Sequence, residues 1–377
     1  MRAIAFLLSL LVSAFAGAQA IPAPAVAARA WLLIDHSSGQ SLAEHEADAR
    51  SEPASLTKLM TAYVTFAALK QGALRGDQVV PVSEKAWKAS GSRMFIEPKR
   101  PVTVDELLRG MVVQSGNDAC IALAEAVAGT EEAFVQRMNL EARRLALANT
   151  HFTNVAGLPD AQHYTTARDL ARLVQALIRD FPEYYPIYAQ KEFTYNKITQ
   201  PNRNRLLWLD PAVDGVKTGH SETAGFCLIA SGKRGPRRLI SVVLGADSDA
   251  LRAQEAQRLL NHGFQNFEPV RLYSKAQPIS QLKVFKGGSA TVAAGFVDDF
   301  ILSLPKGMAD KMKVQLYSQQ PLLAPVQQGQ SIATLKLFLD MGGEMRLFGE
   351  YPVVALETVP VAGIVGRAWD TMMLWFQ

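Results

Sequence analysis

The chain is poor in the residue types that hold metals and form disulfides. Its 377 residues include only two cysteines, Cys120 and Cys227, and six histidines. The histidines show no paired spacing and no His-Glu-x-x-His sequence occurs, so neither a metal site nor another cofactor is expected. Both cysteines lie in apolar stretches, and we therefore expect buried free thiols rather than a disulfide bond.

The chain also has no internal repeat, no low-complexity tract and no strong excess of one charge. Its 39 lysines and arginines nearly balance 35 acidic residues, which leaves a formal net charge of +4. Nucleic-acid binding usually requires a larger or more clustered positive charge, so a nucleic-acid partner is not indicated.

The two ends of the chain carry signals for export and for membrane contact. Residues 1–20 combine a basic start, an apolar run and Ala18-Gln19-Ala20, which together predict a secretory signal peptide removed before Ile21. Residues 361–377 predict an amphipathic helix that is too short and too polar to cross a bilayer. We expect this helix to lie in the membrane plane as a peripheral anchor; the alternative is docking on the protein's own surface.

Ser55-Leu56-Thr57-Lys58 begins a predicted apolar helix that ends near Gly72. Residues three apart on a helix share a face, so the Ser55 and Lys58 side chains can meet. A backbone N–H in the first turn has no partner within the helix and is free to stabilise an oxyanion. Serine becomes a nucleophile when a base takes its proton, and lysine can do so where burial or nearby cations keep it neutral.

Two further short sequences supply the other groups that serine acyl transfer needs. Ser115-Gly116-Asn117 links two predicted helices; its serine can relay a proton and its asparagine amide can hold a peptide carbonyl. Lys217-Thr218-Gly219 precedes a predicted strand, where a fixed cation attracts a carboxylate and glycine allows a substrate backbone to approach closely.

Each of the three sequences also has an ordinary structural interpretation. Ser55 can cap a helix, Ser-Gly-Asn can be a plain loop, and Lys-Thr-Gly can be a solvated strand edge. Ser-x-x-Lys occurs twice more, beginning at Ser280 and Ser303, in strand-like or proline-interrupted segments where chance explains it. The ordered combination, rather than any one sequence, points to a hydrolase.

Ser-x-x-Lys, Ser-Asp-Asn and Lys-Thr-Gly are together the set shared by penicillin-binding proteins and class A β-lactamases, and this chain carries the first and third with Ser-Gly-Asn as the second. In order and spacing, nearly the whole chain resembles the low-molecular-mass penicillin-binding proteins, specifically the D-alanyl-D-alanine carboxypeptidases of the type 5/6 group. Gly116 stands where β-lactamases usually have aspartate, which is the carboxypeptidase form. The resemblance implies removal of the terminal D-alanine from peptidoglycan pentapeptide stems, with β-lactams as covalent inhibitors.

The resemblance also implies roles for individual residues. Ser55 would be the nucleophile and Lys58 its general base, with the backbone N–H groups of Ser55 and His220 as the oxyanion hole. Arg203 and Arg252 would be candidates for carboxylate recognition. The full set of expected catalytic residues is Ser55, Lys58, Ser115 and Asn117. The expected substrate-binding residues are Lys217, Thr218, Gly219, His220, Arg203 and Arg252.

Hydrophobic patterning predicts an α+β chain with two folded domains. Residues 21–268 alternate strand and helix signals, as in an antiparallel sheet flanked by helices, and the resemblance identifies them as a penicillin-binding/β-lactamase-like catalytic domain. Residues 269–360 contain short alternating runs separated by glycine and proline turns, which predicts a small all-β sandwich. The terminal amphipathic helix occupies 361–377.

Related activities remain as alternatives. A DD-endopeptidase that cuts cross-links would be close kin. A class A-like β-lactamase needs a deacylating glutamate, and residues 151–160 contain none. A scaffold with a vestigial site is the non-enzymatic alternative. The two ends of the chain predict an exported protein at the periplasmic face of the bacterial inner membrane, and a homodimer is left open.

Overall fold

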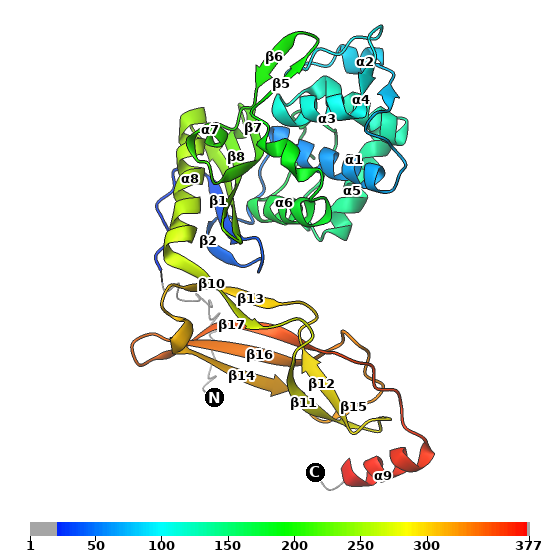
Figure 1. The fold of residues 1–377 in the computed structure, drawn as a ribbon, viewed down its shortest axis with the longest axis vertical. Coiled ribbons are helices and arrows are strands. Elements are labelled where there is room, and N and C mark those ends of the chain that lie inside the picture. The colour runs from blue at the N-terminus through cyan, green and yellow to red at the C-terminus, as the bar shows by residue number, and fades with distance from the viewer. Residues whose placement is uncertain (1–20, 375–377) are drawn as a thin grey trace, which may run out of the picture. The chain divides into compact units, whose positions relative to one another are not determined.

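The computed structural model describes residues 21–374, so the signal peptide predicted at 1–20 lies outside the described residues. The described chain divides into two compact units, Ala23–Pro269 and the part from Val270 onward (Figure 1). The first unit mixes helices and strands, whereas the second consists mainly of strands. The predicted α+β class with a C-terminal β domain is therefore confirmed.

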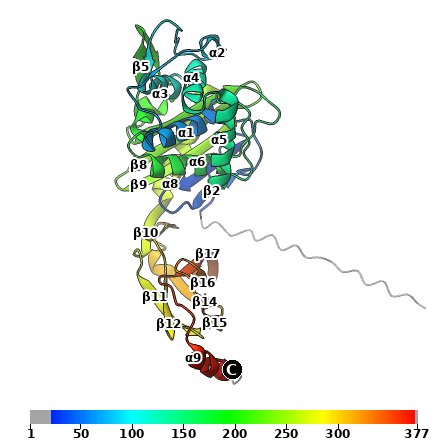
Figure 2. The same cartoon turned by 90° about the vertical axis from the view of Figure 1, so that its right-hand side faces the viewer.

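The first unit is built on an antiparallel sheet with the strand order β2-β1-β9-β8-β7. Helix α8 packs on one face and α6 on the other (Figures 1 and 2), which is why β1 and β9 are almost wholly buried. Strand β7 forms one edge, so one side of its backbone has no neighbouring strand. The strands are β1 (Ala30–Asp35), β2 (Ser41–His45), β7 (Val213–Ser221), β8 (Gly225–Arg234) and β9 (Arg237–Ala246).

Local sequence sets where the longer helices begin. Thr103 and Glu106 form a capping box at the start of α3, and Thr130, Thr166 and Ser248 accept backbone N–H bonds at the starts of α5, α6 and α8. The helices are α1 (Lys58–Lys70), α2 (Glu84–Trp87), α3 (Val104–Val113), α4 (Asn117–Ala128), α5 (Glu131–Arg144), α6 (Ala167–Asp180), η2 (Tyr185–Ala189), α7 (Leu206–Leu209) and α8 (Asp249–Asn266). The short strands are β3 (Val79–Val80), β4 (Val102–Thr103), β5 (Glu192–Tyr195) and β6 (Ile198–Pro201).

The segment predicted as one helix from Ser55 consists of two elements. Ala54–Thr57 forms a 3₁₀ turn, η1, and α1 begins only at Lys58. Ala54, the first residue of the turn, has a φ of 45°, which is outside the right-handed helical region, so the helical path does not extend before it. The predicted start of the helix is therefore wrong in this detail. Because a 3₁₀ turn has three residues, it stacks side chains three apart, and Ser55 lies over Lys58.

The second unit has two β layers. Strands β14-β16-β17-β12-β11-β15 form one sheet, and β10 pairs with β13 in another. Leu302 and Leu304 of β13 pack against Leu337 and Leu339 of β16, which joins the two layers through an apolar interface. The strands are β10 (Phe267–Tyr273), β11 (Pro278–Phe285), β12 (Thr291–Gly295), β13 (Phe300–Pro305), β14 (Met312–Ser318), β15 (Leu322–Leu323), β16 (Ser331–Asp340) and β17 (Met345–Ala355), with a 3₁₀ turn η3 (Ala309–Lys311).

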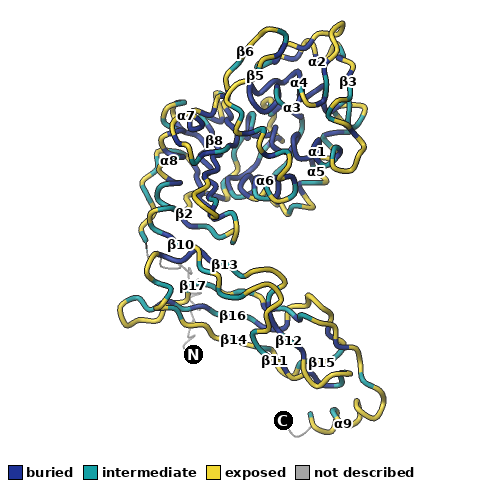
Figure 3. Tube along the Cα trace, viewed as in Figure 1, coloured by how far each residue is buried: buried dark blue, intermediate teal, exposed yellow. Residues whose placement is uncertain are grey.

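Helix α9 (Ile364–Leu374) ends the described chain and exposes its apolar residues (Figure 3). Ile364 is 78% exposed, Val365 84% and Trp369 62%. Asp370 instead turns toward the β unit and accepts a hydrogen bond from the backbone N–H of Lys286. None of the helices within residues 21–374 is long and apolar enough to cross a bilayer.

Candidate active site

The three short sequences singled out above come together in the first unit. Lys58 Nζ lies 2.9 Å from Ser55 Oγ, and Lys217 Nζ lies 3.1 Å from Ser115 Oγ. The lysine side chains are 2% and 3% exposed, whereas Ser55 remains partly open to solvent. The site therefore has a reachable hydroxyl in contact with a buried lysine, beside a second serine–lysine pair that is wholly buried.

The surroundings of Lys58 favour an uncharged amine. Besides Ser55, its Nζ contacts the carbonyl oxygen of Ala156 at 2.7 Å. Burial lowers the pKa of Lys58, and the positive charge of Arg203 lowers it further. A neutral amine can donate one N–H to the Ala156 oxygen while its lone pair accepts the Ser55 proton. This geometry suits a general base.

Lys217 is held on the edge strand β7. Its Nζ donates to Ser115 Oγ and, at 3.1 Å, to the carbonyl oxygen of Thr218. Burial holds the pKa of Lys217 well below its ordinary value, and the charges of Lys58 and Arg203 act in the same direction. Arg203 itself is exposed and has no hydrogen-bond or ion-pair partner within residues 21–374. The site is thus electropositive and offers a free guanidinium to an anionic group.

The Ser-Gly-Asn link is tightly constrained between α3 and α4. Ser115 has a φ of 67°, and Asn117 donates through Nδ2 to the carbonyl oxygen of Ser90 at 2.7 Å. A side chain at Gly116 would place its Cβ 2.8 Å from Oδ1 of Asp118. A side chain at this position would displace Asp118, so packing favours glycine here.

Asp118 is a structural residue of the site that sequence reasoning missed. Its buried carboxylate accepts backbone N–H bonds from Met94, Phe95 and Ile96 at 3.0, 2.8 and 3.2 Å, and from Ala119 at 2.9 Å. It therefore fastens the loop at residues 94–96 to the first turn of α4. The available sequence signal was an acidic residue at the start of an otherwise apolar helix.

Strand β7 lies directly against the nucleophile's turn. A Cβ at Gly219 would lie 3.1 Å from the carbonyl oxygen of Pro53, so only glycine lets the two segments approach this closely. His220 is exposed at the end of the strand and packs on Phe226, with ring centroids 4.1 Å apart. The backbone N–H of Ser55 has no acceptor among the described residues.

Arg203 and Arg252, both expected to recognise a carboxylate, differ in their surroundings. Arg252 is 5% exposed and donates to the carbonyl oxygens of Gly219 at 3.0 Å and Cys227 at 3.2 Å, and also to Asp249. Its guanidinium therefore ties β7 and β8 to α8. Arg203 is the one of these two arginines with a free guanidinium.

The two cysteines are buried free thiols, as predicted. Cys120 lies behind the Ser-Gly-Asn link, and burial raises its pKa to about 12, so the thiol stays protonated. Within residues 21–374, no group of three or more His, Cys, Asp or Glu side chains is arranged to hold a metal ion.

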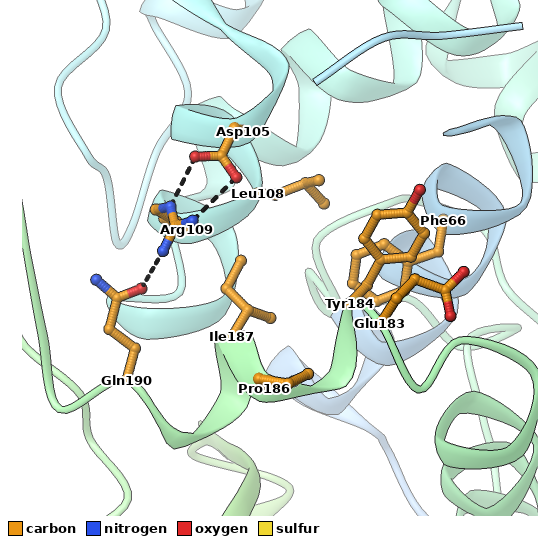
Figure 4. Close-up of a pocket in the computed structure, with 9 residues that line it drawn as sticks. All are labelled: Phe66, Asp105, Leu108, Arg109, Glu183, Tyr184, Pro186, Ile187 and Gln190. Carbon is orange, nitrogen blue, oxygen red and sulfur yellow. Dashed lines mark hydrogen bonds and ion pairs between the residues drawn. The ribbon is translucent and has the colours of Figure 1, made fainter. Parts of the chain in front are cut away.

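A separate cavity of about 290 Å³ lies among α1, α3 and η2 (Figure 4). Phe66 and Tyr184 form one wall, and Arg109 on the opposite side is fixed by Asp105 and Gln190. None of the predicted site residues lines this cavity. It is therefore distinct from the catalytic cluster.

A partly open serine in contact with a buried lysine of lowered pKa, beside a second serine–lysine pair and a free strand edge, is the arrangement typical of a serine hydrolase. Known proteins identify the family. Residues 17–248 match the Peptidase S11 family, described as D-alanyl-D-alanine carboxypeptidase, and residues 267–361 match the C-terminal domain of penicillin-binding protein 5. The chain belongs to the S11 family of serine-type D-alanyl-D-alanine carboxypeptidases.

Individual relatives support this family assignment. D-alanyl-D-alanine carboxypeptidase DacC of Escherichia coli K12 is 42% identical, over 99% of this chain and 94% of the relative. The crystal structure of penicillin-binding protein 5 from Haemophilus influenzae matches with a TM-score of 0.84 and 39% identity, over 90% of this chain and 99% of that one. Ampicillin-bound penicillin-binding protein D2 from Listeria monocytogenes matches with a TM-score of 0.60 and 30% identity, over 65% of this chain and 100% of that one.

Proposed function

We propose that Ser55 of this carboxypeptidase attacks the peptide carbonyl between the last two D-alanines of a peptidoglycan stem, with Lys58 as general base. The observation that carries the proposal is the 2.9 Å contact between Ser55 Oγ and the Nζ of a lysine that is 2% exposed and has a lowered pKa. General-base catalysis requires such contact and a base that is unprotonated near the working pH.

The reaction proceeds in two balanced steps. The Ser55 oxygen forms a bond to the carbonyl carbon as its proton passes to Lys58 Nζ. The C–N bond then breaks, and the proton held on Lys58 passes to the departing D-alanine nitrogen with Ser115, whose hydroxyl contacts Lys217, as the relay; this returns Lys58 to its neutral form. Water hydrolyses the acyl-enzyme with Lys58 again as base, which frees the shortened stem and restores Ser55.

Binding groups surround this centre. The unpaired backbone N–H of Ser55 and that of His220 stabilise the oxyanion of the tetrahedral intermediate. Lys217, Thr218 and Arg203 receive the terminal carboxylate because they supply positive charge and a hydroxyl at the free edge of β7. Arg252 assists indirectly, since it holds the Gly219 carbonyl and hence the strand. The Asn117 amide supports the stem's peptide carbonyl.

β-Lactams are expected to acylate the same hydroxyl, because their strained amide carbonyl occupies the position of the scissile peptide. The ampicillin-bound structure of the Listeria protein supports this expectation by similarity. The leaving group stays tethered to the acyl-enzyme, so release is slow. A fluorescent penicillin is therefore a direct probe of Ser55.

The decisive experiment compares three proteins labelled with fluorescent penicillin: wild type, Ser55→Ala and Ser280→Ala. Ser280 provides a matched control because it begins another Ser-x-x-Lys sequence. Wild type and Ser280→Ala should be labelled and should release D-alanine from a model pentapeptide, whereas Ser55→Ala should do neither. Persistent labelling of Ser55→Ala would show that the nucleophile lies elsewhere.

The ends of the chain support a place for the enzyme at the outer face of the cytoplasmic membrane. Residues 1–20 have the sequence of an export signal, and α9 exposes an apolar face that suits the interfacial region of a bilayer. Vesicle co-sedimentation tests this with Trp369→Asp against Val297→Asp, an exposed apolar residue outside the helix. Only the first change should release the protein from vesicles; equal retention of both would refute the anchor.

A further inference from the structure

The base is oriented by a backbone carbonyl, so the loop that carries this carbonyl must be held in place. Ala156 O lies 2.7 Å from Lys58 Nζ, and the loop around it is folded on the side chain of Asn154. Asn154 Oδ1 accepts the backbone N–H groups of Ala156, Gly157 and Leu158 at 3.2, 2.7 and 2.9 Å. These bonds shape the loop internally but do not attach it to the nucleophile's turn.

The loop and the nucleophile's turn are in close contact. Gly157 has a φ of 83°, and a Cβ there would lie 1.7 Å from the carbonyl oxygen of Ala54 and 2.8 Å from Thr57 Oγ1. A shift of either segment would therefore change the distance between Ala156 O and Lys58. Thr61 of α1 donates to the carbonyl oxygen of Val155 at 2.7 Å, which ties the loop to the helix, and a second connection joins it to the turn itself.

His163 makes that connection. It is 2% exposed, its Nε2 lies 2.8 Å from Thr57 Oγ1, and its Nδ1 lies 3.1 Å from the backbone nitrogen of Thr153. The Thr153 N–H can only donate, so Nδ1 is the acceptor and the ring proton is on Nε2. One neutral imidazole thus donates to the turn that carries Ser55 and accepts from the start of the loop that carries Ala156.

The surroundings keep this ring neutral. Burial lowers the pKa of His163 to about 4, although the negative charges of Asp160 and Glu52 oppose the shift. The nearby His151 adds to the lowering. Protonation would put an N–H on Nδ1 toward the Thr153 N–H, so the bridge depends on the neutral tautomer.

We propose that His163 is a positioning residue for the general base: it fixes the loop 153–158 on the turn 54–57 and so holds the Ala156 carbonyl on Lys58. The inference rests on the proposed roles of Ser55 and Lys58. A purely structural histidine would affect stability alone. A positioning histidine also changes the rate of acylation and its pH dependence, because a displaced loop lets water reach Lys58 and raises its pKa.

The test measures the second-order rate constant for acylation by fluorescent penicillin as a function of pH, together with the melting temperature. His163→Phe keeps the ring volume and removes both hydrogen bonds. A displacement of about 1 Å can slow an enzyme about 100-fold, so we expect a loss of about 10- to 100-fold and an alkaline shift of the rate profile. His163→Gln, whose amide can donate and accept, should recover part of the rate.

Two further variants make the result decisive. His262→Phe places the same substitution at a histidine of α8 outside the site and should leave rate and profile unchanged. Thr57→Val removes the hydroxyl at the other end of the bridge at nearly constant volume, and it should reproduce the slower, alkaline-shifted acylation. If His163→Phe does not fold, Thr57→Val decides the question through the same two measurements.

The outcomes separate this inference from the proposed function. If wild type is not labelled at Ser55, the proposed function fails. If Ser55 is labelled and the folded His163→Phe variant acylates at the wild-type rate with an unshifted profile, only the positioning role is refuted. A lowered melting temperature with unchanged acylation gives the same refutation.

Discussion

The buried carboxylate of Asp118 should be the most sensitive structural point of the site. Its Oδ1 accepts the backbone N–H groups of Met94 and Ala119, and its Oδ2 accepts those of Phe95 and Ile96. Asp118→Asn preserves the shape of the side chain but replaces one acceptor oxygen with an NH₂ group. Whichever way the amide is oriented, two backbone N–H groups then face a donor.

The expected loss follows from these bonds. A hydrogen bond to a charged group contributes about 1.5–3 kcal/mol, so losing two of them should lower the free energy of unfolding of the first unit by about 3–6 kcal/mol. The released loop also carries Ser90, whose carbonyl holds the Asn117 amide. Acylation by fluorescent penicillin should therefore slow as well.

Urea unfolding followed by tryptophan fluorescence, to which the buried Trp31 of β1 contributes, measures the change. Asp105→Asn serves as the control, because Asp105 makes an exposed ion pair with Arg109 one helical turn away. Its loss should be at most about 0.5 kcal/mol. A fall of less than about 1 kcal/mol for Asp118→Asn would refute the view that this carboxylate holds the loop.

Three other perturbations test the site. Because burial lowers the pKa of Lys58, the acylation rate should rise with pH through that lowered pKa and level off at a pH below the pKa of an ordinary lysine. Lys58→Arg, whose guanidinium stays protonated, should acylate about 10²- to 10⁴-fold more slowly. Gly157→Ala should destabilise the first unit by more than about 2 kcal/mol because its Cβ meets a backbone oxygen, whereas Gly72→Ala, with a φ of 73° and open space, should lose about 1 kcal/mol in urea unfolding. Arg203→Gln should lower kcat/KM for a pentapeptide about 10- to 100-fold and raise the pKa of both site lysines, while the exposed Arg205→Gln should change neither.

Regular patterning made the elements predictable. Alternating runs at 313–317 and 332–339 correspond to β14 and β16, which extend them by one residue at each end. The helical pattern over 167–179 corresponds to α6, which ends one residue later. Because one face of each element is buried, its apolar residues recur with the period of a strand or a helix, and this period can be recognised in a single sequence. The 3₁₀ form of residues 54–57 was not predictable, since the hydrophobic pattern continues from this turn into α1 without interruption.

Within the site, the predictable residues were those that act through their own side chains. Ser55, Lys58 and Lys217 belong to sequences whose spacing has a chemical meaning. The groups that hold them in place act mainly on backbone atoms: Asp118 binds N–H groups, Arg252 binds carbonyls, and the contact that orients Lys58 is the Ala156 carbonyl, for which any residue type would serve. Such contacts leave little mark on local sequence, because the partner's identity is irrelevant.

His163 shows why only the folded structure reveals the groups that hold the site side chains in place. In the sequence it is one of six histidines and has no spacing that suggests a role. Its proposed role depends on two partners, the side-chain hydroxyl of Thr57 and the backbone N–H of Thr153, which only the folded chain brings to the two ring nitrogens. A lysine base that is kept neutral by burial needs surrounding segments that do not move apart, because water that reaches the amine stabilises its charged form. The residues that hold these segments around Lys58 are therefore as necessary for the reaction as the serine–lysine pair itself.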